Sequence, residues 1–231
     1  APTEANRKAN HADPRVKETG SSQRIIAEMV KTYAAARSYE DNGEVSLVFI
    51  HPDRRRTVKK AFSTKFARPK FYRFEYTERF GDGENEQNRY VIWSDAAPER
   101  SRTWWTILPN IKEDSLAMAV GAAVGVSSGT SNRITQLLMP DVIRGLPLTG
   151  FKDTRLIGEE AVDDTPCYRI EGTNLKGDPQ TVWIDKTTLL ARKHFSKSRI
   201  PNATVEETTI YHPRINVAIA PEQFEFVPPK P

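Results

Sequence analysis

Residues that could do chemistry are present, but none has the spacing of a catalytic or metal site. They are His11, His51, His194, His212, Cys167 and the acidic pairs Glu159-Glu160 and Asp163-Asp164. A zinc site of the H-E-x-x-H kind needs two histidines on one helix face, and no pair here is so spaced. Adjacent residues of a strand point to opposite faces, so neither acidic pair suits a general acid and base. We expect a protein that is not an enzyme and that needs no cofactor or metal.

Two weaker possibilities stay open. His194 and His212 could lie on adjacent strands, and a deep pocket that held both would favour an enzyme. Cys167 is the only cysteine. In a strand beside Tyr168, a lone cysteine is more often a small buried apolar residue than a nucleophile.

An amphipathic helix is expected first along the chain. It is predicted to begin near Ser21 and Ser22, which are good N-cap residues, and to end near Tyr39 to Gly43. Its apolar positions recur at spacings of three and four: Ile25, Ile26, Met29, Val30, Tyr33 and Ala34. Residues 1–20 are polar and are interpreted as a tail ahead of a single domain over 21–231.

The rest of the chain alternates apolar and polar residues with a period of two. Such a pattern predicts antiparallel strands with one buried face. The expected strands cover 44–50, 58–66, 70–78, 88–95, 101–108, 153–160, 167–172, 181–185, 189–196 and 204–212. A sheet of about ten strands must curl. Between the two sets of strands, about 110–150, we expect a helical insertion with an Ala- and Gly-rich part over 111–126 and a short helix over 131–138.

Composition limits the partners. The net charge is +4, and the only strong basic run is Arg54-Arg55-Arg56 with Lys59 and Lys60, which is typical of a solvated turn rather than of a nucleic-acid interface. No run of about 18 apolar residues is present, so no transmembrane segment is expected. The chain begins Ala1-Pro2-Thr3, which is compatible with an exported chain whose leader has been removed.

Aromatic residues gather in consecutive strands. Trp93, Trp104 and Trp105 follow Tyr72, Phe74 and Tyr76. If the sheet curls, one face becomes concave and apolar. Ordinary core packing against the first helix is one interpretation, and a cavity for an acyl chain is the other. Three arginines alternate with these aromatics and would face solvent or anchor an acidic head group: Arg73, Arg89 and Arg102.

The order of these features resembles a known family. After the first helix and the meander, a hairpin runs Trp183-Ile184-Asp185-Lys186-Thr187, and the chain ends Phe224-Glu225-Phe226-Val227-Pro228-Pro229. The arrangement over about 21–229 is similar to the LolA/LolB-like superfamily of periplasmic outer-membrane lipoprotein-sorting proteins. The resemblance implies a mainly β (α+β) fold: an unclosed antiparallel β-barrel covered by the N-terminal helix and the central insertion. It also implies a periplasmic location and an apolar cavity for lipid or lipoprotein acyl chains.

Two functions follow as hypotheses. The first is a carrier that buries acyl chains between sheet and helices. Its expected lining residues are Tyr72, Phe74, Trp93, Trp104, Leu116, Met118 and Leu138. The second is a sensory or regulatory module that binds another envelope protein and fills the cavity with its own side chains. Fold alone does not decide between them.

Overall fold

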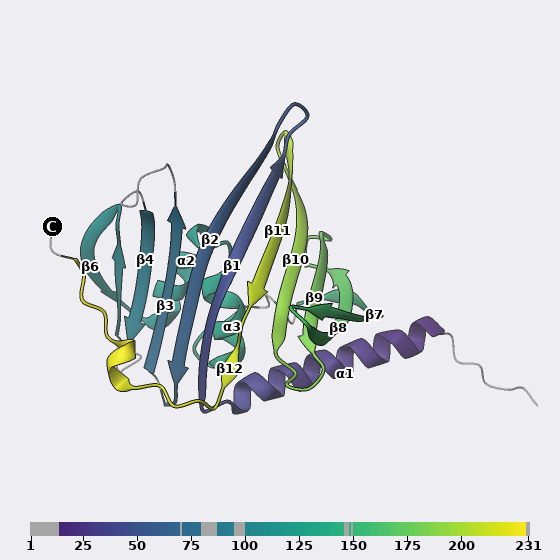
Figure 1. The fold of residues 1–231 in the computed structure, drawn as a ribbon, viewed down its shortest axis with the longest axis horizontal. Coiled ribbons are helices and arrows are strands. Elements are labelled where there is room, and N and C mark those ends of the chain that lie inside the picture. The colour runs from purple at the N-terminus through teal and green to yellow at the C-terminus, as the bar shows by residue number, and fades with distance from the viewer. Residues whose placement is uncertain are drawn as a thin grey trace, which may run out of the picture.

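One large open sheet with helices on a single face makes up the protein in this computed structural model (Figure 1). The structure describes residues 14–69, 71–79, 87–94, 100–145, 148 and 150–229. Most of the expected polar tail lies outside these residues. The helices are α1 (Pro14–Ala35), α2 (Leu116–Val126), α3 (Thr130–Leu138) and the 3₁₀ turn η1 (Pro221–Phe224).

Twelve strands form the sheet, and every pair is antiparallel. They are β1 (Ser38–Ile50), β2 (Arg55–Ala67), β3 (Phe71–Arg79), β4 (Gln87–Ser94), β5 (Ser101–Trp105), β6 (Leu108–Asp114), β7 (Lys152–Val162), β8 (Thr165–Thr173), β9 (Pro179–Asp185), β10 (Ala191–Ile200), β11 (Ala203–Tyr211) and β12 (Arg214–Ile215). Their order is β6-β5-β4-β3-β2-β1-β11-β10-β9-β8-β7, with β12 paired to β1. The end strands β6 and β7 do not pair with each other, so the curled sheet is unclosed, as expected.

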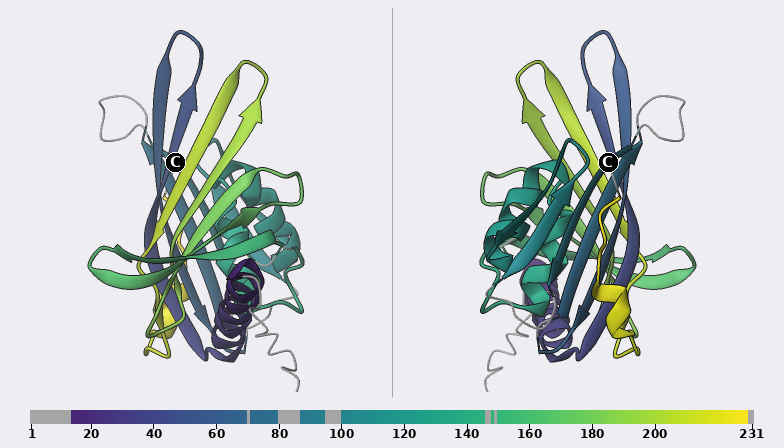
Figure 2. Two further views of the ribbon diagram at one scale, coloured as in Figure 1. Left: turned by 90° about the vertical axis from the view of Figure 1, so that its right-hand side faces the viewer. Right: turned by 90° about the vertical axis from the view of Figure 1, so that its left-hand side faces the viewer.

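The helices lie along the inner face of this sheet, and the end of the chain crosses the outer face (Figure 2). α1 packs on β7 and α3, and α2 packs on α3, β4 and β5. Residues 216–229, here called the C-terminal strap, run over β2 and β3 on the opposite side. The hairpins β1–β2 and β10–β11 extend beyond the helices at one end.

Alternation places the core on the inner face. Tyr72, Phe74 and Tyr76 of β3 are fully buried beneath the helices, and Arg73 and Glu75 point outward. Gly43 has a specific role, because a Cβ atom there would lie 2.4 Å from the Phe62 ring and 2.3 Å from the Ile210 carbonyl oxygen. Its lack of a side chain lets Phe62 cross β1 and pack edge-on against Tyr211, with ring centroids 5.7 Å apart.

Several expected boundaries were wrong. α1 begins at Pro14, not at Ser21, and so includes the last residues of the expected polar tail. Proline is favoured in the first turn of a helix, because its missing N–H group would have no partner there. α1 ends at Ala35, and Asp41-Asn42-Gly43 continue β1, where Gly43 meets Phe62. The expected strand over 101–108 ends at Trp105, and the expected helical insertion starts with a second strand, because residues 108–114 turn back and pair with β5 before α2 begins. The short helix expected at 131–138 is confirmed as α3.

Candidate functional site

The inner face of the sheet under α2 and α3 is the candidate site. Four of the expected lining residues meet there, all fully buried in one apolar cluster: Tyr72, Phe74, Leu116 and Leu138. The Tyr72 hydroxyl lies 2.8 Å from Thr135 Oγ1 of α3, which ties β3 to that helix. Burial raises the pKa of Tyr72 above its ordinary value, so the phenol is neutral. All four lie on the inner face of the sheet, and their contact with a ligand stays a prediction.

Trp93 and Trp104 lie on the opposite face, which corrects their expected position. In the antiparallel register, Trp93 pairs with Arg73 and Trp104 pairs with Val91, so both point outward. There they pack against Phe226 of the C-terminal strap, with ring centroids 5.2 Å and 5.5 Å away. Because Trp104 and Trp105 are adjacent in one strand, only one of them can face inward, and it is Trp105.

Two of the three arginines that alternate with these aromatics, Arg73 and Arg89, contact the C-terminal strap, whereas Arg102 lies near Glu113 of β6. Arg73 donates a hydrogen bond to the Glu225 carbonyl (2.7 Å) and lies over the Phe226 ring with its guanidinium 5.6 Å from the centroid. Arg89 lies 5.0 Å from the same centroid. Glu75 joins the two arginines, and their charges and hydrogen bonds hold its pKa below the usual value although burial raises it.

Met118 is 63% exposed, which also corrects its expected place in the cavity. α2 contains no polar or charged residue from Leu116 to Val126. Its buried face is formed by Leu116, Ala119, Val120 and Ala123, and its exposed face by Ala117, Met118, Gly121, Ala122 and Gly125. A helix that is apolar all round is normally buried, so this exposed face is unusual.

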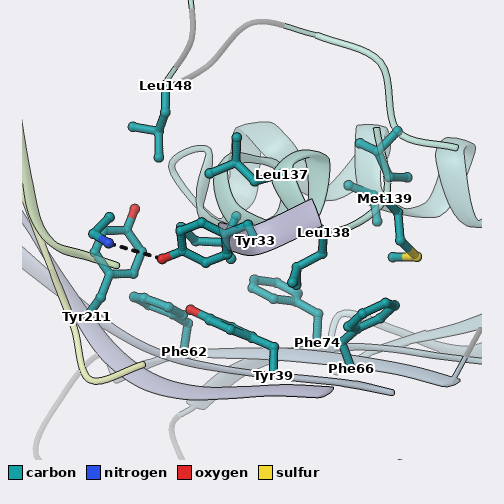
Figure 3. Packing of buried hydrophobic residues seen from close by; sticks show 14 of the residues in the cluster. Tyr33, Tyr39, Phe62, Phe66, Phe74, Leu137, Leu138, Met139, Leu148 and Tyr211 are labelled. Carbon is teal, nitrogen blue, oxygen red and sulfur yellow. Dashed lines mark hydrogen bonds between the residues drawn. The ribbon is translucent and has the colours of Figure 1, made fainter. Parts of the chain in front are cut away.

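The centre of the half-barrel is filled by the protein's own side chains (Figure 3). Aromatic rings from the sheet point toward Tyr33 of α1 and toward Leu137 and Leu138 of α3. The Tyr33 hydroxyl accepts a hydrogen bond from the Ala191 amide (3.1 Å). An acyl chain therefore has no room between α1, α3 and the middle of the sheet without movement.

A small cavity of about 180 Å³ lies between α2 and strands β4–β6. Its apolar walls come from Tyr90, Trp105, Leu108, Ala122 and Val126. Its polar residues are Thr103, Asn110 and Lys112. Trp105 is fixed by a hydrogen bond from its indole nitrogen to Asn88 Oδ1 (2.5 Å) and by an edge-on contact with Tyr90. We call this opening the α2 cleft.

Polar residues are also buried on the inner face, farther from α2. Arg133 of α3 forms an ion pair with Glu207 and donates to Thr209 Oγ1 (3.0 Å). His194 is almost fully buried, and desolvation, with the nearby charge of Arg133, holds its pKa well below the usual value. Its imidazole is therefore neutral.

His194 and His212, the pair considered from the sequence, do not lie together. His194 lies on the inner face, whereas His212 follows β11 and its ring approaches the Asn42 carbonyl and Asp163 near the surface. Within the part of the chain that the structure describes, no three His, Cys, Asp or Glu side chains are grouped as metal ligands. Cys167 is buried on the outer face beside Val162 and Trp183, and burial raises the pKa of its thiol to about 11, as expected for a structural cysteine.

The arrangement agrees with the family that the sequence resembles. An open antiparallel sheet carries its helices on the inner face and leaves its two end strands unpaired. The chain has the unclosed, helix-covered sheet that the resemblance to that family implied. A family model described as "Predicted periplasmic protein (DUF2092)" matches residues 128–231, just under half of the chain, and its description agrees with the expected periplasmic location. No curated protein matches the sequence. No helix among the described residues is both long and apolar enough to cross a bilayer.

Several solved structures are similar over most of the chain. LprF from Mycobacterium bovis is 12% identical with a TM-score of 0.49, covering 87% of this chain and 95% of LprF. The lipoprotein LppX from Mycobacterium tuberculosis is 14% identical with a TM-score of 0.47, covering 87% and 98%. MucB, in the MucA/MucB complex of Pseudomonas aeruginosa, is 12% identical with a TM-score of 0.46, covering 90% and 61%.

Proposed function

We propose that this chain is a periplasmic binding protein that holds an acyl chain of a lipid or lipoprotein between α2 and the inner face of β3–β6. The observation that carries the proposal is α2 itself. It is apolar on every side, exposes one apolar face, and covers a cleft walled by Tyr90, Trp105 and Leu108. An acyl chain is a ligand that matches such walls.

The cleft opens beside exposed apolar side chains. Leu108 of β6 lines it and is 51% exposed. Met118 of α2 is 63% exposed and lies one helical turn before Ala122, which also lines the cleft. Ile111 points to the opposite face of β6 and takes no part in it. Exposed apolar residues beside a cleft mark a site of interaction with an apolar partner.

Binding requires α2 to move, because about 180 Å³ is smaller than the roughly 300–1,000 Å³ of ordinary ligand pockets. Exposing its two largest buried side chains, Leu116 and Val120, costs about 3–6 kcal/mol, taking roughly 1.5–3 kcal/mol for each. Burying ten methylenes gains about 8 kcal/mol. A chain of ten carbons or more therefore offsets the displacement of α2.

Native mass spectrometry of the purified protein, with and without added phospholipid and fatty acid, tests the proposal. We expect an acyl-chain adduct of defined stoichiometry. Ala122→Phe should abolish the adduct, because Ala122 lines the cleft and the new ring fills it. Ala117→Phe, on the same helix but outside the cleft, is the matched control and should keep it. Equal uptake by both folded variants would place the ligand elsewhere.

A second candidate is a module that binds another envelope protein. The filled centre of the half-barrel favours it, because Tyr33, Tyr39 and Phe62 already occupy the space that a cargo would need. The same mass spectra separate the two candidates. A clean mass, with no uptake of any added lipid, would favour the protein-binding module.

A further inference from the structure

The α2 cleft changes in polarity from one end to the other. Three residues of β6 line it at every second position: Leu108, Asn110 and Lys112. The register sets Trp105 opposite Leu108 and Thr103 opposite Lys112. At about 3.4 Å per residue, the apolar end and the cationic end are about 14 Å apart. The cleft is therefore amphipathic along its length.

The charge of Lys112 is available to a ligand. Its neighbour Glu113 points to the other face, where it lies near Arg100 and Arg102. Asp114 returns to the same face as Lys112, and its carboxylate accepts the Ser115 amide hydrogen at 3.1 Å. Among the described residues, no acidic side chain is within ion-pair distance of Lys112.

The start of α2 and the Asp114 carboxylate lie at the same end and act on an anionic head group in opposite directions. Ser115 is the N-cap of α2, three residues after Lys112, and the amide groups of a first helical turn favour an anion. At the other end the walls are Val126, Trp105 and Tyr90. The Lys60 amine beside them donates to the Val126 carbonyl oxygen (2.7 Å) and is paired with Glu78. Among the described residues that line the cleft, Lys112 is the one with a charged side chain. Charge and apolar surface thus lie in the order of head and tail in an anionic amphiphile.

We infer that the α2 cleft selects anionic amphiphiles, with Lys112 contacting the carboxylate or phosphate head and the hydrocarbon directed toward Leu108, Trp105 and Val126. This inference rests on the proposed acyl-chain function and adds the class of ligand to it. The ordinary role of a lysine on an end strand is to discourage pairing with another sheet, and the experiment must separate that role from binding.

Isothermal titration calorimetry of the full chain distinguishes ligand binding by Lys112 from protection of the end strand. The three probes each have twelve carbons: dodecanoate, dodecyl phosphate and dodecanol. We expect the unmodified protein to prefer the anions over the alcohol by roughly 3- to 10-fold, as for a partly exposed charged contact. Lys112→Gln should remove this preference and leave the affinity for dodecanol unchanged, whereas Lys112→Arg should keep it. Lys176→Gln, in the exposed β8–β9 turn, is the matched control.

The outcomes are distinct. Preference for dodecanoate or for dodecyl phosphate identifies the head group as carboxylate or phosphate, and either supports the inference. Equal affinity for all three probes would overturn it and leave the proposed function standing. An equal loss for all probes in Lys112→Gln would show that Lys112 only supports the strand. If the unmodified protein binds no probe, the inference and the proposed function both fail.

Discussion

Replacement of Phe226 by alanine tests whether the C-terminal strap holds the outer face of the sheet. The Phe226 ring is 9% exposed and lies between Trp93 and Trp104. Arg73 and Arg89 lie over it. Removing the ring loses about 1.5–3 kcal/mol of burial and roughly 0.5–1.5 kcal/mol for an aromatic contact. We expect Phe226→Ala to lower the free energy of unfolding by about 3 kcal/mol.

Thermal unfolding and urea unfolding measure this change. For a chain of this length, about 3 kcal/mol corresponds to a fall in Tm of roughly 6–12 °C. The fluorescence emission of Trp93 and Trp104 should also shift to longer wavelength, because their buried indole rings become exposed to water. Val227→Ala is the control, since the neighbouring Val227 side chain is 85% exposed and its loss should cost almost nothing.

The reasoning would be refuted if Phe226→Ala and Val227→Ala unfolded at the same temperature with unchanged tryptophan emission. That result would mean that the strap is detached in solution. Uptake of an acyl chain should be the same in both variants, because the strap and the α2 cleft lie on opposite faces of the sheet.

Three further predictions concern the inner face and the helix that covers it. Burial raises the pKa of Asp41 from 3.8 to about 7 despite hydrogen bonds from the Tyr39 hydroxyl and the His212 amide, so the folded state binds the proton more tightly than the unfolded chain. Its contribution to the free energy of unfolding is therefore present below about pH 4 and is lost as the pH rises to about 7. Urea unfolding at pH 4 and pH 8 measures this loss, and Asp41→Asn should reduce it by roughly 2–4 kcal/mol. The same loss of stability in the variant and the unmodified protein would contradict the prediction. Gly43→Ala should destabilise by about 1–3 kcal/mol, since its Cβ would meet backbone as well as a ring, and an unchanged midpoint of unfolding would disprove the close approach. Gly121→Ala should stabilise by about 0.5–1 kcal/mol, because the added methyl meets open space in a helix, and a loss of stability would show that this face of α2 is covered.

Much of the sheet could be predicted from local patterns. Tyr72, Phe74 and Tyr76 alternate with Arg73 and Glu75, and this period of two is enough to predict a strand with one buried face. The short helix α3 also has a clear apolar side. Local patterns do not show which residue far along the chain a given side chain will contact. Nothing near Gly43 indicates that the Phe62 ring must pass over it.

The candidate site was harder to predict for two physical reasons. Trp93 and Trp104 have the composition of core residues, and they are indeed buried, but by Phe226, which is more than a hundred residues away. Both faces of the sheet are covered at that point, so aromatic content alone cannot decide which is inside. In α2 every residue is apolar, so no polar stripe marks the exposed side, and the exposure of Met118 has no signal in the sequence.

The missing hydrogen bonds between β6 and β7 have a mechanical consequence. In a closed barrel, the circumference is set by backbone ladders and cannot change unless they break. Here no backbone ladder among the described residues joins the two margins of the sheet, and packed side chains link β7 to α1, α1 to α3, α3 to α2, and α2 to β4 and β5. These contacts can slide by small amounts at little cost, whereas a broken ladder leaves polar groups unpaired. The width of the half-barrel can therefore adjust, and a wider bound ligand would change the spacing of three helices instead of the pairing of twelve strands.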